Sequence, residues 1–146
     1  MSLRQLFLGF DGRINRARYW GATGILLLVG VMIAILEILL SSATSEKVGS
    51  DVGFGLNLIA AIPSLAVAAK RLHDRDLSAW WTLLLLAPLP LVIIGMHFQS
   101  GLVIAIILLT FSGLGIWFFV QTGCLRGTVG PNRFGPDPLG EPERLI

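Results

Sequence analysis

The sequence predicts an all-α membrane protein with four transmembrane helices, a short N-terminal interfacial helix and a non-helical C-terminal tail rich in Gly and Pro. Of its 146 residues, 54% are hydrophobic and 14% are charged, whereas soluble domains are about 45–50% apolar and about 25% charged. The mean hydropathy is +0.78, and the charges form short clusters between long uncharged segments. Because a soluble chain of this size cannot bury so much apolar surface, a soluble enzyme, a disordered chain and a secreted disulfide scaffold are excluded.

Four segments are long and apolar enough to cross a bilayer. A spanning helix needs about 20 mainly apolar residues, and we expect spans over about residues 19–40, 52–69, 79–96 and 102–120. A helix satisfies its own backbone hydrogen bonds in lipid, and the four segments lack the alternating polarity of barrel strands. Residues 1–140 are therefore expected to form a single membrane domain, with 141–146 as a loose tail.

The residues before the first span carry the pattern of a short amphipathic helix. Four apolar residues fall on one helical face: Leu3, Leu6, Phe7 and Phe10. Eight residues make only about 12 Å of helix, so we expect this helix to lie flat in the inner interface; a disordered N-terminus is the alternative. Asn15 is the expected N-cap of the first span.

A cleaved signal peptide is the competing interpretation of the first span. The apolar region of a signal peptide has about 7–15 residues, whereas residues 19–40 form a longer apolar segment. We therefore expect this helix to be retained.

The orientation follows from the positions of Lys and Arg. These residues gather in the N-terminal segment, between spans two and three, and in the C-terminal tail, whereas the loop between spans one and two carries only Lys47. The positive-inside rule places both termini in the cytoplasm. Aromatic residues gather at membrane interfaces, and four are expected as anchors at the inner one: Tyr19, Trp20, Trp80 and Trp81.

Three polar stretches are too distinctive for ordinary loops. They run over residues 10–20 (FDGRINRARYW), 71–81 (RLHDR, then SAWW) and 130–139 (GPNRFGPDPL). Together they resemble domain-of-unknown-function family 805, small bacterial inner-membrane proteins, over nearly the whole chain. Ala79 departs from the family's Gly, and Lys70 stands where Arg is usual. The resemblance implies a helical fold in the bacterial inner membrane, and it implies no activity.

The three polar stretches all fall on the predicted cytoplasmic side, so we expect them to form one surface. Its expected members are Arg13, Arg16, Arg71, His73, Asp74, Arg75, Asn132, Arg133 and Asp137. Arg–Asp pairs between stretches, with Asp74 and Arg133 as the pair to test, would hold this end of the bundle together. Spare guanidinium groups would bind phosphate, from lipid headgroups or an anionic ligand. Alternatively, the arginines only fix topology and solvate loops.

These features favour a non-enzymatic accessory or interaction protein of the inner membrane. No paired base and nucleophile, G-x-S-x-G or H-E-x-x-H occurs, and we expect no catalytic residues, cofactor or metal. The expected partners are membrane lipids, anionic phospholipid among them, with a protein partner or a homo-oligomer left open. The net charge of +2 is too small for nucleic-acid binding.

A small oligomeric carrier or channel subunit is the alternative function. Glu37 is the ionisable residue inside a predicted span, and intramembrane acids mark transport pathways. Pro63, Pro88 and Pro90 would break two of the helices. By helix rise Glu37 would lie about 4.5 Å from the outer end of its helix, where it reaches water.

Overall fold

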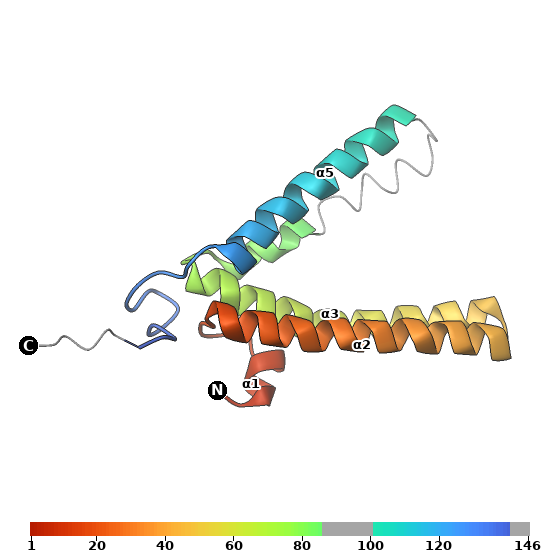
Figure 1. Ribbon diagram of the computed structural model, residues 1–146, viewed down its shortest axis with the longest axis horizontal. Helices are drawn as coiled ribbons and strands as arrows, with labels where there is room; N and C mark the ends of the chain where they lie inside the picture. Colours follow the sequence, from red (N-terminus) through yellow and green to blue (C-terminus); the bar gives the residue numbers. More distant parts are fainter. Residues whose placement is uncertain (86–100, 141–146) are drawn as a thin grey trace, which may run out of the picture.

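The computed structural model describes residues 1–85 and 101–140. Two arms diverge from one end of the molecule (Figure 1). One arm is the hairpin of α2 (Arg16–Ala43) and α3 (Glu46–Asp74), and the other contains α5 (Gly101–Phe119). The N-terminus and the last described residues of the tail both lie where the arms meet (Figure 1).

Three described helices are long and apolar enough to cross a membrane: α2, α3, and α5 with the π-helical turn η2 (Val120–Cys124) that continues it. They contain the spans predicted over 19–40, 52–69 and 102–120. The prediction for α3 was too short at both ends, since the helix also includes Glu46–Asp51 and Lys70–Asp74. Hydropathy detects only the apolar centre of a helix, whereas backbone hydrogen bonding continues into its polar ends.

The fourth predicted span begins at η1 (Ala79–Leu85), a short 3₁₀ helix. The rest of residues 79–96, including Pro88 and Pro90, lies outside the described residues, as does the predicted loose tail 141–146. Pro63 lies inside α3, which continues through it.

The predicted N-terminal helix is α1 (Leu3–Leu8). Ser2 and Gln5 form a capping box at its start, and Gly9 caps its end in an extended conformation. Phe10, which the periodicity placed on this helix, therefore lies beyond it, because glycine stops a helix readily. Asn15 is the N-cap of α2, as predicted, and its side chain accepts a hydrogen bond from the backbone N–H of Arg18.

The apolar core lies where α1 crosses the start of the hairpin. Ile14, Ala22 and Val67 are at most 2% exposed, and Leu6 and Phe7 of α1 pack against them. Part of the apolar face predicted for the interface is therefore covered by α2 and α3, while Leu3 stays 73% exposed.

The hairpin closes tightly at its far end. Thr44 caps α2, and Ser45 immediately caps α3. A Cβ atom added to Gly49 would lie 2.7 Å from the Glu37 carbonyl oxygen and 2.8 Å from the Ser41 nitrogen. The two backbones approach this closely because Gly49 has no side chain.

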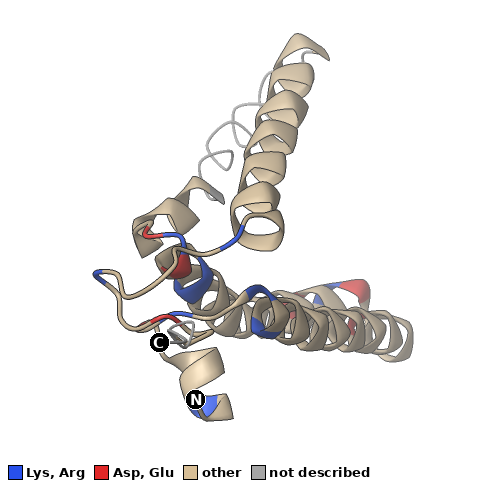
Figure 2. Ribbon diagram, turned by 60° about the vertical axis from the view of Figure 1, so that its left-hand side comes forward, with Lys and Arg blue, Asp and Glu red and all other residues tan. Residues whose placement is uncertain are grey.

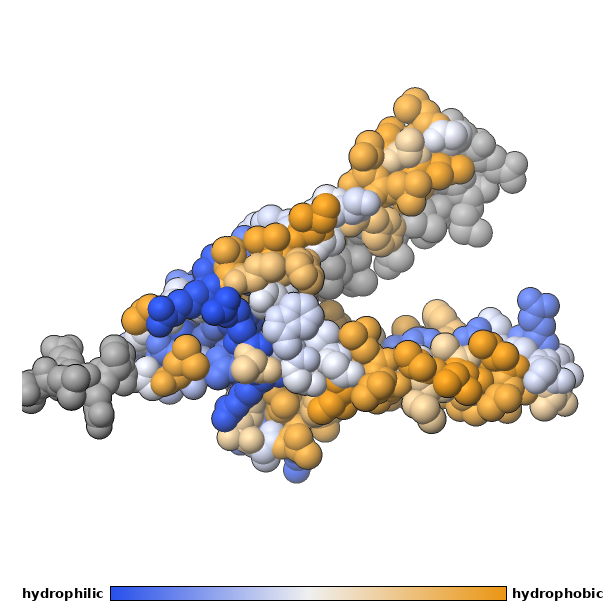
Figure 3. Space-filling model, in the orientation of Figure 1, coloured by the Kyte–Doolittle hydropathy of each residue, from blue (hydrophilic) through white to orange (hydrophobic). Residues whose placement is uncertain are grey.

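The second arm does not pack along the hairpin, so the described helices do not form the closed bundle that we expected. No residue of α5 is buried, and its contacts with the other arm are at its base, where the Phe119 and Trp20 ring centroids are 5.8 Å apart. Figure 3 shows apolar surface along both arms and hydrophilic surface where they meet. In a bilayer, an apolar side chain gains little when it leaves lipid to pack against a neighbouring helix, because lipid tails are equally apolar. The exposure of apolar side chains on α5 therefore carries no hydrophobic penalty.

Candidate functional site

Buried polar side chains gather at the junction of the two arms, and we call this cluster the polar hub. Its members are at most 7% exposed: Arg13, Lys70, Arg71, His73, Asp74 and Thr122. Figure 2 shows the charged residues around this junction. The hub joins the start of α2, the last turn of α3, the end of η2 and the tail.

Asp74 binds two arginines. Arg13 Nη2 lies 3.0 Å from Asp74 Oδ1, and Arg71 Nη1 contacts Asp74 Oδ2. The side chains of all three are at most 4% exposed. A buried charge is tolerated only when it is paired and fully hydrogen-bonded, and here two cations share one anion. These three side chains therefore carry one excess positive charge that other groups must stabilise.

Main-chain carbonyl groups supply that stabilisation. Arg13 donates to the tail, with distances of 2.6, 2.8 and 3.2 Å to the carbonyl oxygens of Thr128, Gly130 and Gly135. Arg71 donates to the carbonyl oxygens of Thr122, Leu125 and Ile14. Each arginine thus ties α3 or the start of α2 to segments more than fifty residues away in sequence.

The unpaired carbonyl groups at the C-terminal ends of helices explain why several cations lie in and beside the hub. The last carbonyl groups of a helix have no partner within it and carry partial negative charge. Lys70 Nζ donates to the Gln5 carbonyl at 2.6 Å and to that of Gly9, at the end of α1. Arg16 donates to the Cys124 carbonyl at the end of η2. These cations satisfy carbonyl groups at the ends of helices.

The tail is held against the end of α3 by aromatic and amide groups. The His73 ring stacks on Phe134, with centroids 3.9 Å apart and planes 6° apart. His73 Nδ1 lies 3.2 Å from the Gly12 carbonyl oxygen, and so donates to it. The Arg133 guanidinium lies 4.7 Å from the Phe134 centroid, and Asn132 donates to the His73 carbonyl at 2.9 Å.

Gly127 and Asp137 shape the tail around the hub. A Cβ atom on Gly127 would lie 2.5 Å from Asp74 Cγ, so only glycine fits there. The Asp137 carboxylate accepts hydrogen bonds from the backbone N–H groups of Leu139 and Gly130, both at 2.9 Å. These bonds stabilise the charged form and lower the pKa of Asp137 from its ordinary 3.8.

The structure brings all nine predicted cluster residues to this end of the molecule and contains Arg–Asp pairs between the stretches, but Asp74 and Arg133 are not partners. Asp74 pairs with Arg13 and Arg71, while Arg133 pairs with Asp76 at 3.2 Å, with both side chains about half exposed. Arg75 donates to the Arg126 carbonyl. The spare guanidinium groups that we predicted therefore do not include Arg13 and Arg71, because the N–H groups of these two residues are bonded inside the hub.

Three of the four predicted aromatic anchors contact other segments at the junction. Tyr19 accepts a hydrogen bond from Thr122 Oγ1 at 3.0 Å, and Trp20 Nε1 donates to the Gly123 carbonyl at 3.3 Å. Trp81 lies beside Trp117, with centroids 5.4 Å apart. Trp80 is 77% exposed and projects from η1.

Glu37 lies farther from the end of its helix than the sequence indicated. α2 continues for six residues beyond it, to Ala43, which is about 9 Å of helix. Its carboxylate packs over Gly53, where an added Cβ atom would lie 2.5 Å from Oε2. A role for Glu37 in transport stays a prediction.

Several residues in the hub and in the tail around it were not predicted from the sequence. Thr122, Gly127 and Thr128 give no local signal, because their role is to place a carbonyl group or leave space at a position set by the fold. Lys70 drew notice only as a departure from the family's Arg, and its complete burial follows from α1 packing over it.

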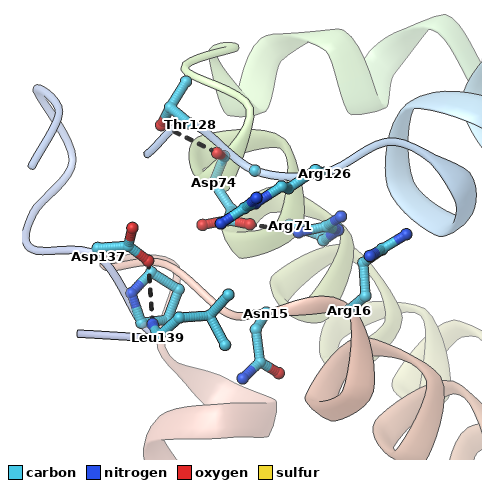
Figure 4. Close-up of a pocket in the computed structure, with 10 residues that line it drawn as sticks. Asn15, Arg16, Arg71, Asp74, Arg126, Thr128, Asp137 and Leu139 are labelled. Carbon is cyan, nitrogen blue, oxygen red and sulfur yellow. Dashed lines mark hydrogen bonds and ion pairs between the residues drawn. The ribbon is translucent and has the colours of Figure 1, made fainter. Parts of the chain in front are cut away.

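A polar cavity of about 210 Å³ opens beside the hub (Figure 4). Its lining includes Asn15, Arg16, Arg71, Asp74, Arg126, Thr128 and Asp137. Arg16 and Arg126 are exposed, while Arg71 and Asp74 are buried in its wall. Among the residues that the structure describes, no group of three or more His, Cys, Asp or Glu is placed to hold a metal ion. The arrangement suits a small anion better than a cation.

The chain is similar to inner-membrane proteins of Escherichia coli. The chain is 32% identical to the inner membrane protein YhaH of Escherichia coli K12 over 138 residues, which cover 93% of this chain and 92% of YhaH. It is 33% identical to the inner membrane protein YhaI of the same organism, over 94% of this chain and 92% of YhaI. It is 25% identical to the uncharacterized protein YiiR, over 94% and 90%. No solved structure matches the chain.

The family model for "Protein of unknown function (DUF805)" matches residues 7–136, which include the first two polar stretches and most of the third. The names of the relatives and the three apolar helices indicate an inner-membrane protein. The chain therefore belongs to the DUF805 family.

Proposed function

We propose that this protein is a non-enzymatic interaction protein of the inner membrane, whose cytoplasmic face binds the phosphate of anionic lipid headgroups. The observation that carries the proposal is the cavity beside the hub, where the exposed guanidinium groups of Arg16 and Arg126 lie near an excess buried positive charge. A guanidinium group binds phosphate oxygens through charge-assisted hydrogen bonds.

The charge balance of the cavity supports an anionic ligand. Arg71 lines it, and the Asp74 carboxylate beside it is already shared by two arginines. Asp137 also lines it, but its carboxylate accepts two backbone hydrogen bonds from the tail. The lining therefore has three guanidinium groups and two carboxylates, which leaves a net positive charge.

The position of the cavity favours a lipid headgroup over a soluble protein. The long apolar segment of α2 begins at Tyr19 and Trp20, within one helical turn of Arg16. Basic groups at that depth meet the negative surface of the cytoplasmic leaflet, and each contributes about 1 kcal/mol of attraction. A cavity of this size also suits a phosphate group better than a folded partner.

The same geometry argues for a binding role without catalysis. Arg13, Arg71, His73 and Asp74 of the hub have side chains that could take part in catalysis, but each is already bonded to backbone or to another member of the hub. A reacting group needs a free atom directed at a substrate.

Binding of a water-soluble headgroup tests this proposal. We expect sn-glycerol 3-phosphate, but not glycerol, to raise the melting temperature of the detergent-solubilised protein in a saturable way. The double variant Arg16→Gln/Arg126→Gln should lose this shift, while Lys47→Gln, an exposed cation in the first turn of α3, should keep it. An equal shift in the double variant would exclude the cavity as the phosphate site.

A further inference from the structure

α1 is held rigidly across the start of the hairpin. The buried Lys70 ammonium binds carbonyl groups at its C-terminal end, the capping box orders its N-terminal end, and Leu6 and Phe7 pack on the apolar core. Figure 1 shows α1 turned away from the direction of α2 and α3, beside the hairpin. The helix α1 therefore projects from one side of the α2–α3 hairpin in a fixed position.

A groove of about 600 Å³ lies between α1 and the α2–α3 hairpin. Its walls come from three helices: Phe7 and Leu8 of α1, Ile25, Leu26, Val29 and Ile33 of α2, and Leu56, Ile59, Ala60, Ile62 and Pro63 of α3. Arg4 is the charged residue of the lining. An apolar groove with a cation on one wall matches the two parts of a phospholipid, whose chain is apolar and whose phosphate is negative.

A second groove, of about 240 Å³, repeats this pattern on a different face of α1. It is lined by Met1, Leu6, Arg18, Gly21, Ala22 and Ile25. Arg4 and Arg18 are both exposed. Each groove thus combines an apolar wall with one exposed guanidinium group. The buried arginines of the hub, in contrast, already donate their hydrogen bonds to other groups of the protein.

We propose that α1 and the hairpin form a binding site for an anionic phospholipid, with an acyl chain in the larger groove and the phosphate bound by Arg4. Arg18, in the neighbouring smaller groove, adds positive charge beside this site. The exposed apolar residues Leu3 and Leu8 hold α1 in the interface, and the groove begins at that level and continues along α2 and α3. The fixed position of α1 orders the site before the lipid arrives, which lowers the entropy cost of binding.

This site is separate from the cavity beside the hub. It uses Arg4 and Arg18 instead of Arg16 and Arg126, and it requires an acyl chain, whereas the cavity beside the hub needs only phosphate. The two proposals therefore fail independently: glycerol 3-phosphate tests the hub cavity, and a full-length phospholipid tests the α1 site.

Retention of lipid by the intact protein provides the test. The full chain is purified in a neutral detergent and mixed with equal amounts of phosphatidylglycerol and phosphatidylcholine that carry the same acyl chains. Native mass spectrometry then measures the ratio of the two bound lipids. We expect phosphatidylglycerol to be preferred, and Arg4→Gln and Arg18→Gln each to lower the preference by about fivefold.

Matched variants separate the contributions of charge and groove. Lys47→Gln removes the same charge at the far end of the hairpin and should leave the preference unchanged. Ala60→Phe fills the larger groove and should lower retention of both lipids, whereas Ala105→Phe, at an exposed position of α5, should not.

Two outcomes would overturn the proposal. One is an unchanged preference in the Arg4→Gln/Arg18→Gln double variant. The other is a loss of retention in Ala60→Phe no greater than in Ala105→Phe. Because Arg4 and Arg18 are exposed, these substitutions should leave the fold intact, and Ala60→Phe provides a second measurement that does not depend on charge.

Discussion

The polar hub and the far end of the α2–α3 hairpin are both close contacts, but they are built from opposite kinds of residue. In the hub, large charged side chains reach across more than fifty residues of sequence to bind carbonyl groups. At the far end, Gly49 has no side chain and lets α3 approach the backbone of α2, and Gly53 leaves room for the Glu37 side chain. The hub joins segments that are distant in sequence, whereas the glycine contact only brings together helices already connected by a tight turn.

We therefore expect the hub to stabilise the whole fold and the glycine contact to stabilise only the far end of the hairpin. We expect the loss of a hub residue to release a distant segment. Arg13 binds the tail, Arg71 binds Ile14, Thr122 and Leu125, and Lys70 binds the end of α1. Loss of the glycine contact separates two helix ends and leaves the other segments in place. Three predictions test this distinction, in decreasing order of expected effect.

Asp74→Asn should have the largest effect. The substitution leaves Arg13 and Arg71 buried without their shared carboxylate, and breaking a buried ion pair costs about 3–5 kcal/mol. We expect this loss in the free energy of unfolding, measured by denaturant titration in detergent. Asp76→Asn breaks an ion pair with side chains about half exposed, and should cost about 0–1 kcal/mol. Similar losses in the two variants would contradict the special role of the hub.

Gly49→Ala should have an intermediate and local effect. The added Cβ atom meets backbone atoms of Glu37 and Ser41, which cannot move aside as a flexible side chain can, and overpacking costs about 1–3 kcal/mol. Spin labels at Ser42 and Ser50, in a chain with Cys124→Ser, should move apart while the tail keeps its resistance to protease. Gly55→Ala is the matched control, because its Cβ atom meets open space, and no change in the label distance is expected.

Acidification should have the smallest effect. The pKa of Asp137 is lowered from 3.8 because Leu139 and Gly130 donate backbone hydrogen bonds to the carboxylate. A lowered folded-state pKa stabilises the fold at pH above 3.8, and this contribution is lost as the pH falls through the lowered value. Protease cleavage of the tail should therefore rise in that acid range. Asp137→Asn should cleave at the same rate at each pH, and a pH step retained in that variant would assign the effect to another group.

The sequence was sufficient for the elements whose cause is local. Asn15 caps α2, and the apolar segments 19–40, 52–69 and 102–120 lie within helices, because capping and hydropathy depend on neighbouring residues. The last turn of α3 was missed for the same reason. Lys70 to Asp74 look like a polar loop until the tail and α1 supply the groups that allow these residues to be buried in a helix.

By itself, the sequence determined a helical membrane protein, its apolar helices and the stretches in which its charges gather. The tertiary structure alone decided that Asp74 pairs with Arg13 and Arg71 and that Arg133 binds Asp76. It also decided which arginines are buried and which are exposed. Hydropathy and capping act over a few residues, so they can be read along the chain. Burial and pairing of a charge depend on which distant carbonyl groups the fold brings within hydrogen-bonding distance, and those are set only when the helices meet.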